Sequence, residues 1–299
     1  MTPTPAQPFF VVGAQRSGTT MLRLMLNRHP LLHVPFESRF IPDFARHPLA
    51  APDTASAATM RLLLPTIMDD DFVRKGQLVP DPQRVLAREP ASYPALVDAI
   101  FDENARIHGK VRWGDKTPSY VLEMDCLWSL FPGCRFVHLV RDGRDVACSL
   151  RRLSWGSRDL LHAARDWRWK VTMGRKMGAM VPGHYLELRY EDLVLRTEPT
   201  LQRLCAFLGV AYDPAMLDYP VDATRHMPDQ SLQWHRASVS APDPGLVGLW
   251  RDRLGKADLR VFEEVAGDAL EAFGYERTRA PRTLASRVQY ARYALFGHA

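Results

Sequence analysis

A glycine-bearing turn near the N-terminus has the residue types of a phosphate-binding loop. It follows the apolar run Phe9–Val12, a predicted buried strand, and leads into an apolar stretch at 21–26 that predicts a helix. Gly13 and Gly18 are spaced as in a P-loop, but threonine stands where that motif has its lysine. Such a turn directs backbone N–H groups and the positive end of a helix dipole at an anion. We therefore predict an anion site whose cation is Arg16.

A second candidate anion site follows another predicted buried strand, at residues 135–141. The strand leads into Arg141-Asp142-Gly143-Arg144-Asp145, and Ser149 lies eight residues after Arg141. Arginine offers phosphate a planar, permanently charged donor fork, and a hydroxyl adds a neutral donor. The alternative is a set of surface ion pairs at a strand–helix turn. Two anion sites after two strands favour a nucleotide with phosphates at both ends.

Together these segments resemble the motifs of sulfotransferases that use 3′-phosphoadenosine-5′-phosphosulfate (PAPS). Residues 15–20 resemble the 5′-phosphosulfate loop, and the segment from 136 to Ser149 resembles the 3′-phosphate motif. The resemblance covers about residues 8–275. It implies PAPS as donor, with 3′-phosphoadenosine-5′-phosphate (PAP) as product, and a P-loop-like α/β fold whose mainly parallel sheet is flanked by helices, the nucleotide lying at the carboxyl ends of the strands. The nucleotide-binding residues that it implies are Arg16, Ser17, Gly18, Thr19, Thr20, Arg141, Ser149, Tyr190 and Ser240.

Glu37 is the candidate general base. It resembles the glutamate of the Glu-Thr-Arg element in tyrosylprotein sulfotransferases, the nearest group by motif, where this residue is the proposed base. That group usually has a second acid just before it, whereas this chain has Phe36. A positioned carboxylate that takes the proton of the attacking hydroxyl contributes about 10²–10⁴-fold to the rate. The alternatives are a simple pair between Glu37 and Arg39, or a base role for His29 or His33.

Lys116 is the candidate for stabilising the leaving group. It resembles the family's lysine in a Lys-Thr/Asp-Pro element, which approaches the leaving phosphate and the bridging oxygen. Sulfuryl transfer, like phosphoryl transfer, depends mainly on positioning and on stabilising charge. The implied catalytic residues are therefore Glu37, Lys116 and Arg16, acting in an in-line transfer without a metal. A solvated surface lysine is the alternative for Lys116.

Two later segments extend the resemblance. Residues 188–193 match a family element in which the residue corresponding to Tyr190 lies near the nucleotide, although a core tyrosine is nearly as good an interpretation. Residues 234–240 and 248–251 resemble the C-terminal segment of bacterial and tyrosylprotein-type members, which often closes over the nucleotide. Trp250 is assigned to core packing. The candidate contacts in this segment are Arg236, Ser238 and Ser240.

Strand-like and helix-like segments alternate along the chain, which predicts an α/β fold with a mainly parallel sheet. We predict one sulfotransferase domain over residues 1–299, with residues 42–94 as a lid or substrate-side insertion of helices and loops. Further strands are predicted at 31–35 and 185–190. Further helices are predicted at 92–108, 142–150, 158–180, 197–208 (with Gly209 as its C-cap) and 258–273.

The composition is that of a globular protein, with 299 residues of which 46% are hydrophobic and 24% charged. The net charge of +5 suits an anionic ligand, and no signature of nucleic-acid binding accompanies it. The N-terminus lacks a secretory signal and no long apolar run predicts membrane insertion, so we expect a cytoplasmic protein. The sequence leaves open whether the protein forms a homodimer. The cysteines, expected to be reduced and mostly in the core, are Cys126, Cys134, Cys148 and Cys205.

Two other functions are weighed against sulfuryl transfer. A P-loop nucleoside or small-molecule kinase shares this fold, but the absent lysine and the pair Arg141 and Ser149 argue against it. The second alternative function is that of a catalytically inactive relative that only binds a nucleotide. The joint presence of Arg16, Glu37 and Lys116 argues against it. The sequence leaves the hydroxyl acceptor open among a protein tyrosine, a carbohydrate, a lipid and a small metabolite.

Overall fold

The computed structural model describes residues 7–154, 156, 159–221, 223, 234, 236–278, 284, 288 and 291. Within these residues, five strands form a parallel sheet in the order β2-β3-β1-β4-β5. The strands are β1 (Phe9–Val12), β2 (Leu32–His33), β3 (Arg112–Lys116), β4 (Arg135–Val140) and β5 (Tyr185–Arg189). This confirms the predicted α/β class with a parallel sheet. Because all the strands run the same way, their carboxyl ends meet at one edge.

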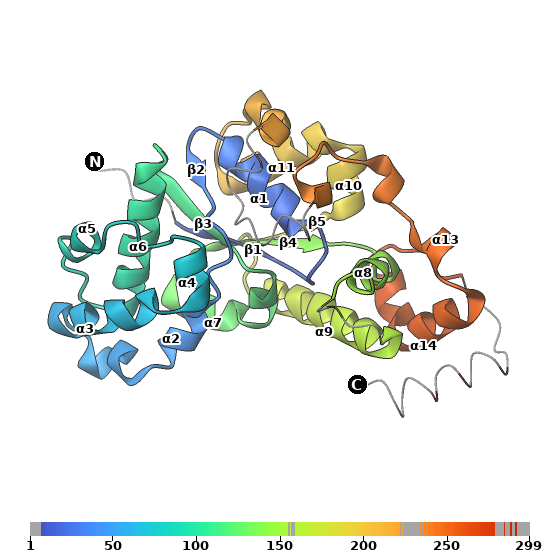
Figure 1. Cartoon of the computed structure of the whole chain (residues 1–299), viewed down its shortest axis with the longest axis horizontal. Helices are drawn as coiled ribbons and strands as arrows, with labels where there is room; N and C mark the ends of the chain where they lie inside the picture. The colour runs from blue at the N-terminus through green and yellow to red at the C-terminus, as the bar shows by residue number, and fades with distance from the viewer. Residues whose placement is uncertain are drawn as a thin grey trace.

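Helices cover both faces of the sheet (Figure 1). Strand β1 shows why, since Phe9 and Val11 pack into one apolar cluster while Phe10 and Val12 pack into another. The first cluster includes α1 (Thr19–Arg28), α10 (Tyr190–Leu195) and α11 (Thr197–Leu208). The second includes α2 (Phe40–Ala45), α3 (Ala57–Met68), α6 (Tyr93–Ile107) and α7 (Met124–Leu130). A strand buried on both faces accounts for the continuous apolar run in the sequence.

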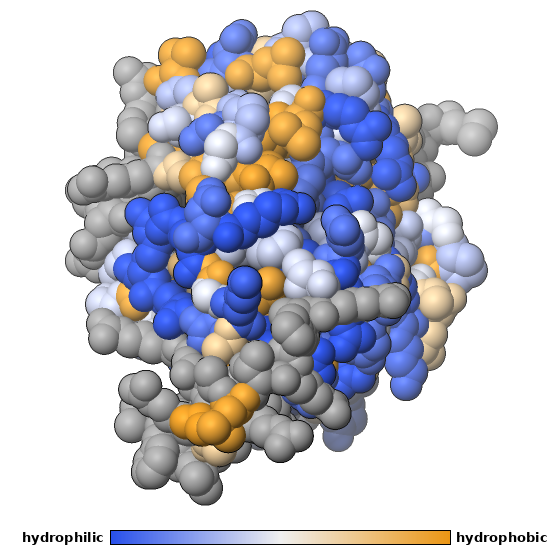
Figure 2. Space-filling view, turned by 90° about the vertical axis from the view of Figure 1, so that its right-hand side faces the viewer, coloured by the Kyte–Doolittle hydropathy of each residue, from blue (hydrophilic) through white to orange (hydrophobic). Residues whose placement is uncertain are grey.

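A third apolar cluster lies beyond the carboxyl end of β4. It joins α8 (Gly143–Leu150), α9 (Leu160–Ala179), α13 (Trp250–Arg253) and α14 (Lys256–Ala272). Hydrophilic residues predominate on the outside of this part of the molecule (Figure 2). Across the described residues, no helix combines the length and the apolar character needed to cross a bilayer.

The predicted helices lie within two residues of their observed bounds, and Gly209 ends α11 in the left-handed conformation that the C-cap prediction requires. The region 42–94 contains α3, α4 (Asp71–Lys75) and α5 (Pro82–Leu86), as expected for helices and loops. The four cysteines are free, and all but Cys126 are buried. Three predicted strands differ at their bounds. Strand β2 is shorter than 31–35, β4 ends at Val140 rather than Arg141, and Tyr190 begins α10 rather than ending β5.

Strand β3 was not predicted, although it is an interior strand of the sheet, between β2 and β1. Its sequence Arg-Trp-Gly-Asp-Lys contains three charged residues and a glycine, which are unfavourable in strands. Gly114 is required by packing, because a Cβ there would lie 2.5 Å from the ring of Phe9 on β1. Asp115 and Lys116 are both fully buried, so this polar strand carries two ionisable groups to the edge where the sheet ends.

Candidate active site

The turn between β1 and α1 has the backbone conformation of an anion cradle. Gly18 adopts φ 91° before the first turn of α1, and a Cβ on it would lie 2.4 Å from the ring of Tyr190. The buried hydroxyl of Ser17 has no hydrogen-bond partner among the described residues. Arg16 adopts φ 68°, which is uncommon for a residue with a side chain. The turn therefore offers backbone N–H groups at a helix N-terminus together with a spare buried hydroxyl.

The Arg16 side chain turns away from its own loop and reaches the second predicted anion site. Its Nε donates to the Ser149 hydroxyl at 3.1 Å, and its Nη2 donates to the Trp234 carbonyl at 2.8 Å. Arg141 donates to the Arg16 carbonyl at 3.4 Å, and its guanidinium lies 4.3 Å from the ring centroid of Tyr190. Burial and the charge of Arg141 lower the pKa of Arg16. Two guanidinium groups held this close make a strongly positive site for an anion.

Two further polar residues belong to this region but were not predicted from the sequence. Arg152 lines the same cavity as Arg16 and Ser149, and its charge also lowers the pKa of Arg16. Arg152 lies in the turn just after α8, three residues beyond Ser149, and its closeness in sequence to the motif could have identified it. Gln15 also lines the cavity and accepts a hydrogen bond from Lys170 at 2.5 Å.

The predicted base and the predicted leaving-group lysine are in direct contact. Lys116 Nζ donates to Glu37 Oε1 at 2.6 Å, and Arg39 Nη2 donates to Glu37 Oε2 at 3.1 Å. Burial alone would raise the pKa of the Glu37 carboxyl, but the ammonium of Lys116 and the guanidinium of Arg39 more than offset it and hold this pKa at about 2. Lys116 itself is fully buried, which excludes the solvated-lysine alternative. Burial and nearby Arg23 lower the pKa of Lys116, although Glu37 acts in the opposite direction.

Of the two histidines that competed with Glu37, His33 lines a neighbouring cavity and His29 lines neither. Neither His29 nor His33 lines the cavity that Glu37 lines. His29 Nε2 bonds to the carbonyl of Ala211 at 2.8 Å, and His33 Nε2 bonds to Asn104 Oδ1 at 2.7 Å. The geometry therefore favours Glu37 over either histidine as the group that meets a ligand in this cavity.

One cavity of about 1180 Å³ joins the two anion sites to Glu37. Neither Ser17 nor Lys116 lines this cavity. Lys116 is hydrogen-bonded to Glu37, which does line it. Ser238 lines the cavity, whereas Ser240 is exposed and its carbonyl accepts from the Tyr219 hydroxyl. The side chain of Arg236 lies outside the described residues. The predicted site residues that line it together are Arg16, Gly18, Thr19, Thr20, Glu37, Arg141, Ser149 and Tyr190.

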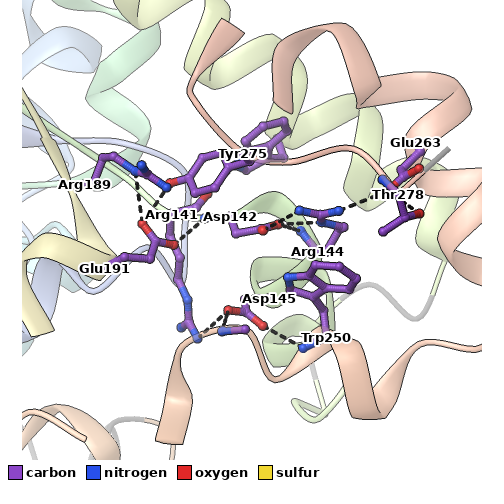
Figure 3. Close-up of polar contacts among 12 residues, drawn as sticks. Arg141, Asp142, Arg144, Asp145, Arg189, Glu191, Trp250, Glu263, Tyr275 and Thr278 are labelled. Atoms are coloured by element: carbon purple, nitrogen blue, oxygen red, sulfur yellow. Dashed lines mark hydrogen bonds and ion pairs between the residues drawn. The ribbon is translucent and has the colours of Figure 1, made fainter. Parts of the chain in front are cut away.

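A buried network fixes the C-terminal segment against this cavity (Figure 3). Asp145 accepts hydrogen bonds from the backbone N–H groups of Gly248 at 2.8 Å and Trp250 at 2.9 Å. Arg141 pairs with Asp145 at 3.7 Å and donates to the Leu246 carbonyl at 2.7 Å. The ion pairs of this turn are thus mostly buried rather than solvated surface pairs, and they hold residues 246–250 beside Arg141.

The same network confirms the core position of Trp250. Its side chain is buried, and the guanidinium of Arg144 lies 3.7 Å from its ring centroid. Arg144 also pairs with Asp142 at 2.8 Å and with Glu263 at 3.0 Å. The second arginine of the Arg-Asp-Gly-Arg-Asp element therefore has a structural role, while the first faces the cavity.

A model of the sulfotransferase family matches residues 8–214, which contain both predicted anion sites, Glu37 and Lys116. The chain belongs to the sulfotransferase family. It is 27% identical to the nodulation protein NoeE of Sinorhizobium fredii, over 90% of this chain and 66% of that protein. It is also 27% identical to protein-tyrosine sulfotransferase 1 of Danio rerio, over 70% of this chain and 55% of that protein.

A solved sulfotransferase structure supports the same fold. The sulfotransferase domain of the olefin synthase from Synechococcus PCC 7002 is 25% identical, with a TM-score of 0.63. The match covers 92% of this chain and 98% of that domain.

Proposed function

We propose that this sulfotransferase moves a sulfuryl group from PAPS to an acceptor hydroxyl, with Glu37 as the general base. The observation that carries the proposal is one cavity that joins a cluster of arginines to the candidate base. Arg16, Arg141 and Ser149 line this cavity together with Glu37, and Glu37 is paired with the buried Lys116. A donor with a phosphate on its ribose and a phosphosulfate on its other arm needs both a phosphate clamp and a reacting centre within one cavity.

The residues present fit a PAP-like nucleotide. The Nε atom of Arg141, a residue that lines the cavity, is buried without a hydrogen-bond partner among the described residues, which is costly unless a ligand satisfies it. Gly18 lets the backbone approach an anion closely, and the aromatic ring of Tyr190 lies beside it. We assign Arg16 with Arg141, Ser149 and Arg152 to the 3′-phosphate, and the N–H groups around Thr19 and Thr20 to the 5′-phosphosulfate. Ser238 is a better candidate contact than Ser240, because it lines the cavity.

The proposed reaction is an in-line displacement at sulfur. The acceptor oxygen forms a bond to sulfur while the bond from sulfur to the 5′-phosphate oxygen breaks, and its electron pair leaves with PAP. Glu37 accepts the proton of the acceptor hydroxyl, and Lys116 stabilises the charge on the leaving oxygen. The depressed pKa of Glu37 is maintained by Lys116, so a shift of the ammonium toward the leaving group makes Glu37 a stronger base at the moment when it is needed.

Isothermal titration with PAP, run beside ATP with Mg²⁺, tests the donor assignment. We expect PAP to bind tightly without a metal and ATP to bind poorly. A preference for ATP with Mg²⁺ would favour the kinase function and contradict the roles of Arg141 and Ser149. PAPS turnover with a panel of phenol, sugar and lipid hydroxyls would then separate an active enzyme from an inactive nucleotide-binding relative.

A further inference from the structure

A second cavity, of about 890 Å³, lies beside the first. Phe36 and Lys75 line both cavities, and Glu37 follows Phe36 directly in the chain. The second cavity is bounded by α1, by the segment after β2, by α4 and by the end of α6. A molecule held there can therefore reach the border where the candidate base stands.

The lining of the second cavity is positively charged. It includes Arg23, Arg74 and Lys75 but neither aspartate nor glutamate among the described residues. Asp71 pairs with both Arg74 and Lys75, so one negative charge offsets two positive charges there. Burial lowers the pKa of Arg23 to about 10 while Glu37 acts against this, so Arg23 is cationic at neutral pH. The balance leaves the cavity suited to a negatively charged group.

The rest of the lining combines fixed polar groups with apolar walls. The Oδ1 atom of Asn104 accepts a hydrogen bond from His33 Nε2, and its amide nitrogen donates to the carbonyl of Leu78 at 3.0 Å. Asn27 holds both the N–H and the carbonyl of Val34, at 2.7 and 2.9 Å. Apolar contact surface comes from Val34, Val73, Val79 and Ile107. A small number of rigid polar groups within an apolar wall is the usual composition of a site for a small organic molecule.

We propose that the second cavity binds the acceptor, and that the acceptor is a small hydroxyl compound bearing a carboxylate or phosphate group. This inference rests on the proposed function, because it places the acceptor hydroxyl at Glu37 and the anionic group at Arg23, assisted by Arg74 and Lys75. A guanidinium fork matches the geometry of both oxyanions. Arg23 and Arg74 line only the second cavity, so they are not part of the donor site.

The test uses PAPS with acceptor pairs that differ in charge. The pairs are 4-hydroxyphenylacetate with 4-hydroxyphenylacetamide, and glycerol 3-phosphate with glycerol; comparing the two pairs separates a carboxylate from a phosphate preference. We expect kcat/KM for an anionic member to exceed that for its neutral partner at least about tenfold. Arg74→Gln should reduce this preference while leaving PAP affinity unchanged. Arg46→Gln is the matched control, because Arg46 is exposed, pairs with Glu123 and lines neither cavity.

A second variant and a direct binding measurement test the same inference independently of Arg74→Gln. Arg23→Lys retains the buried charge but loses the fork, and thermal unfolding reports whether it folds. The PAP-loaded protein is also titrated directly with both members of each pair. Equal treatment of charged and neutral members, in turnover and in titration, would overturn the anionic-acceptor inference while sulfuryl transfer stands. Failure to bind PAP would instead overturn the proposed function itself.

Discussion

Lys116 and Glu37 form a buried ion pair in which Nζ and Oε1 are 2.6 Å apart. The candidate leaving-group cation and the candidate base therefore neutralise each other before either meets a reactant. In this arrangement, charge that develops on the leaving oxygen competes with Glu37 for the same ammonium. Proton acceptance and leaving-group stabilisation are thereby coupled through one contact.

Glu37→Gln should leave PAP affinity within about twofold of wild type and lower turnover by about 10²–10⁴-fold. The amide preserves the shape of the side chain but cannot accept the acceptor proton. The measurements are PAP titration and PAPS-dependent turnover with any accepted hydroxyl. Turnover at the wild-type rate would remove Glu37 from the role of base.

The pH profile distinguishes Glu37 from a histidine base. Because Lys116 and Arg39 outweigh burial and hold the pKa of Glu37 at about 2, its carboxylate stays ionised as pH falls from 8 to 5. We therefore expect kcat/KM to show no acid limb from the base over this range. An acid limb near pH 6.5, the ordinary pKa of histidine, that disappears in His33→Asn would assign the base role to His33 instead.

Arg141→Ala should weaken PAP binding by about 10- to 100-fold, because it removes a charged donor from the 3′-phosphate. Adenosine 5′-monophosphate, which lacks that phosphate, should bind wild type and variant almost equally. Arg168→Ala is the control, since Arg168 is exposed and pairs with Asp268 away from the cavity. An equal loss for both nucleotides would place Arg141 somewhere other than the 3′-phosphate.

Glu263→Gln should lower the free energy of unfolding by about 3–5 kcal/mol, because it leaves the buried charge of Arg144 with a weaker partner. The Glu263 carboxylate is fully buried and also accepts from the N–H and hydroxyl of Thr278 at 2.9 Å (Figure 3). Denaturant unfolding measures the change. Asp268→Asn breaks an exposed pair and should lower the free energy of unfolding by no more than about 1 kcal/mol. Equal effects of the two substitutions would show that the buried pair stabilises the fold no more than the exposed pair does.

The sequence predicted the elements whose burial gives them a continuous apolar signal. Strand β1 is apolar throughout and β4 is mostly apolar, and both lie inside the sheet, so their positions and the turns after them were recognisable. Strand β3 gave no such signal, because its charged residues are stabilised by partners that are distant in the chain, such as Glu37 for Lys116. Pairing of that kind depends on the folded arrangement and not on local residue preference.

The site residues were easier to identify than their partners. The spacing of the two motifs identified Arg16, Arg141 and Ser149 as candidates, but not that Arg16 would bond to Ser149. The contact joins residues 133 positions apart, and the left-handed backbone at Arg16 is likewise not indicated by a local pattern in the sequence. Ser238 lines the cavity and Ser240 is exposed. Both are serines of the C-terminal segment, so residue type alone could not show which of them lies at the site.

Arg16 is bonded to Ser149, 133 residues away, and to Trp234, 218 residues away. Contacts of such long range form only after the entropy of closing the intervening loops has been overcome. A nascent chain that has not yet emerged beyond residue 234 cannot complete the surroundings of this arginine. A nucleotide that binds only the completed arrangement would therefore act as a chemical chaperone, raising the folded population by mass action and protecting the newly made protein from proteolysis.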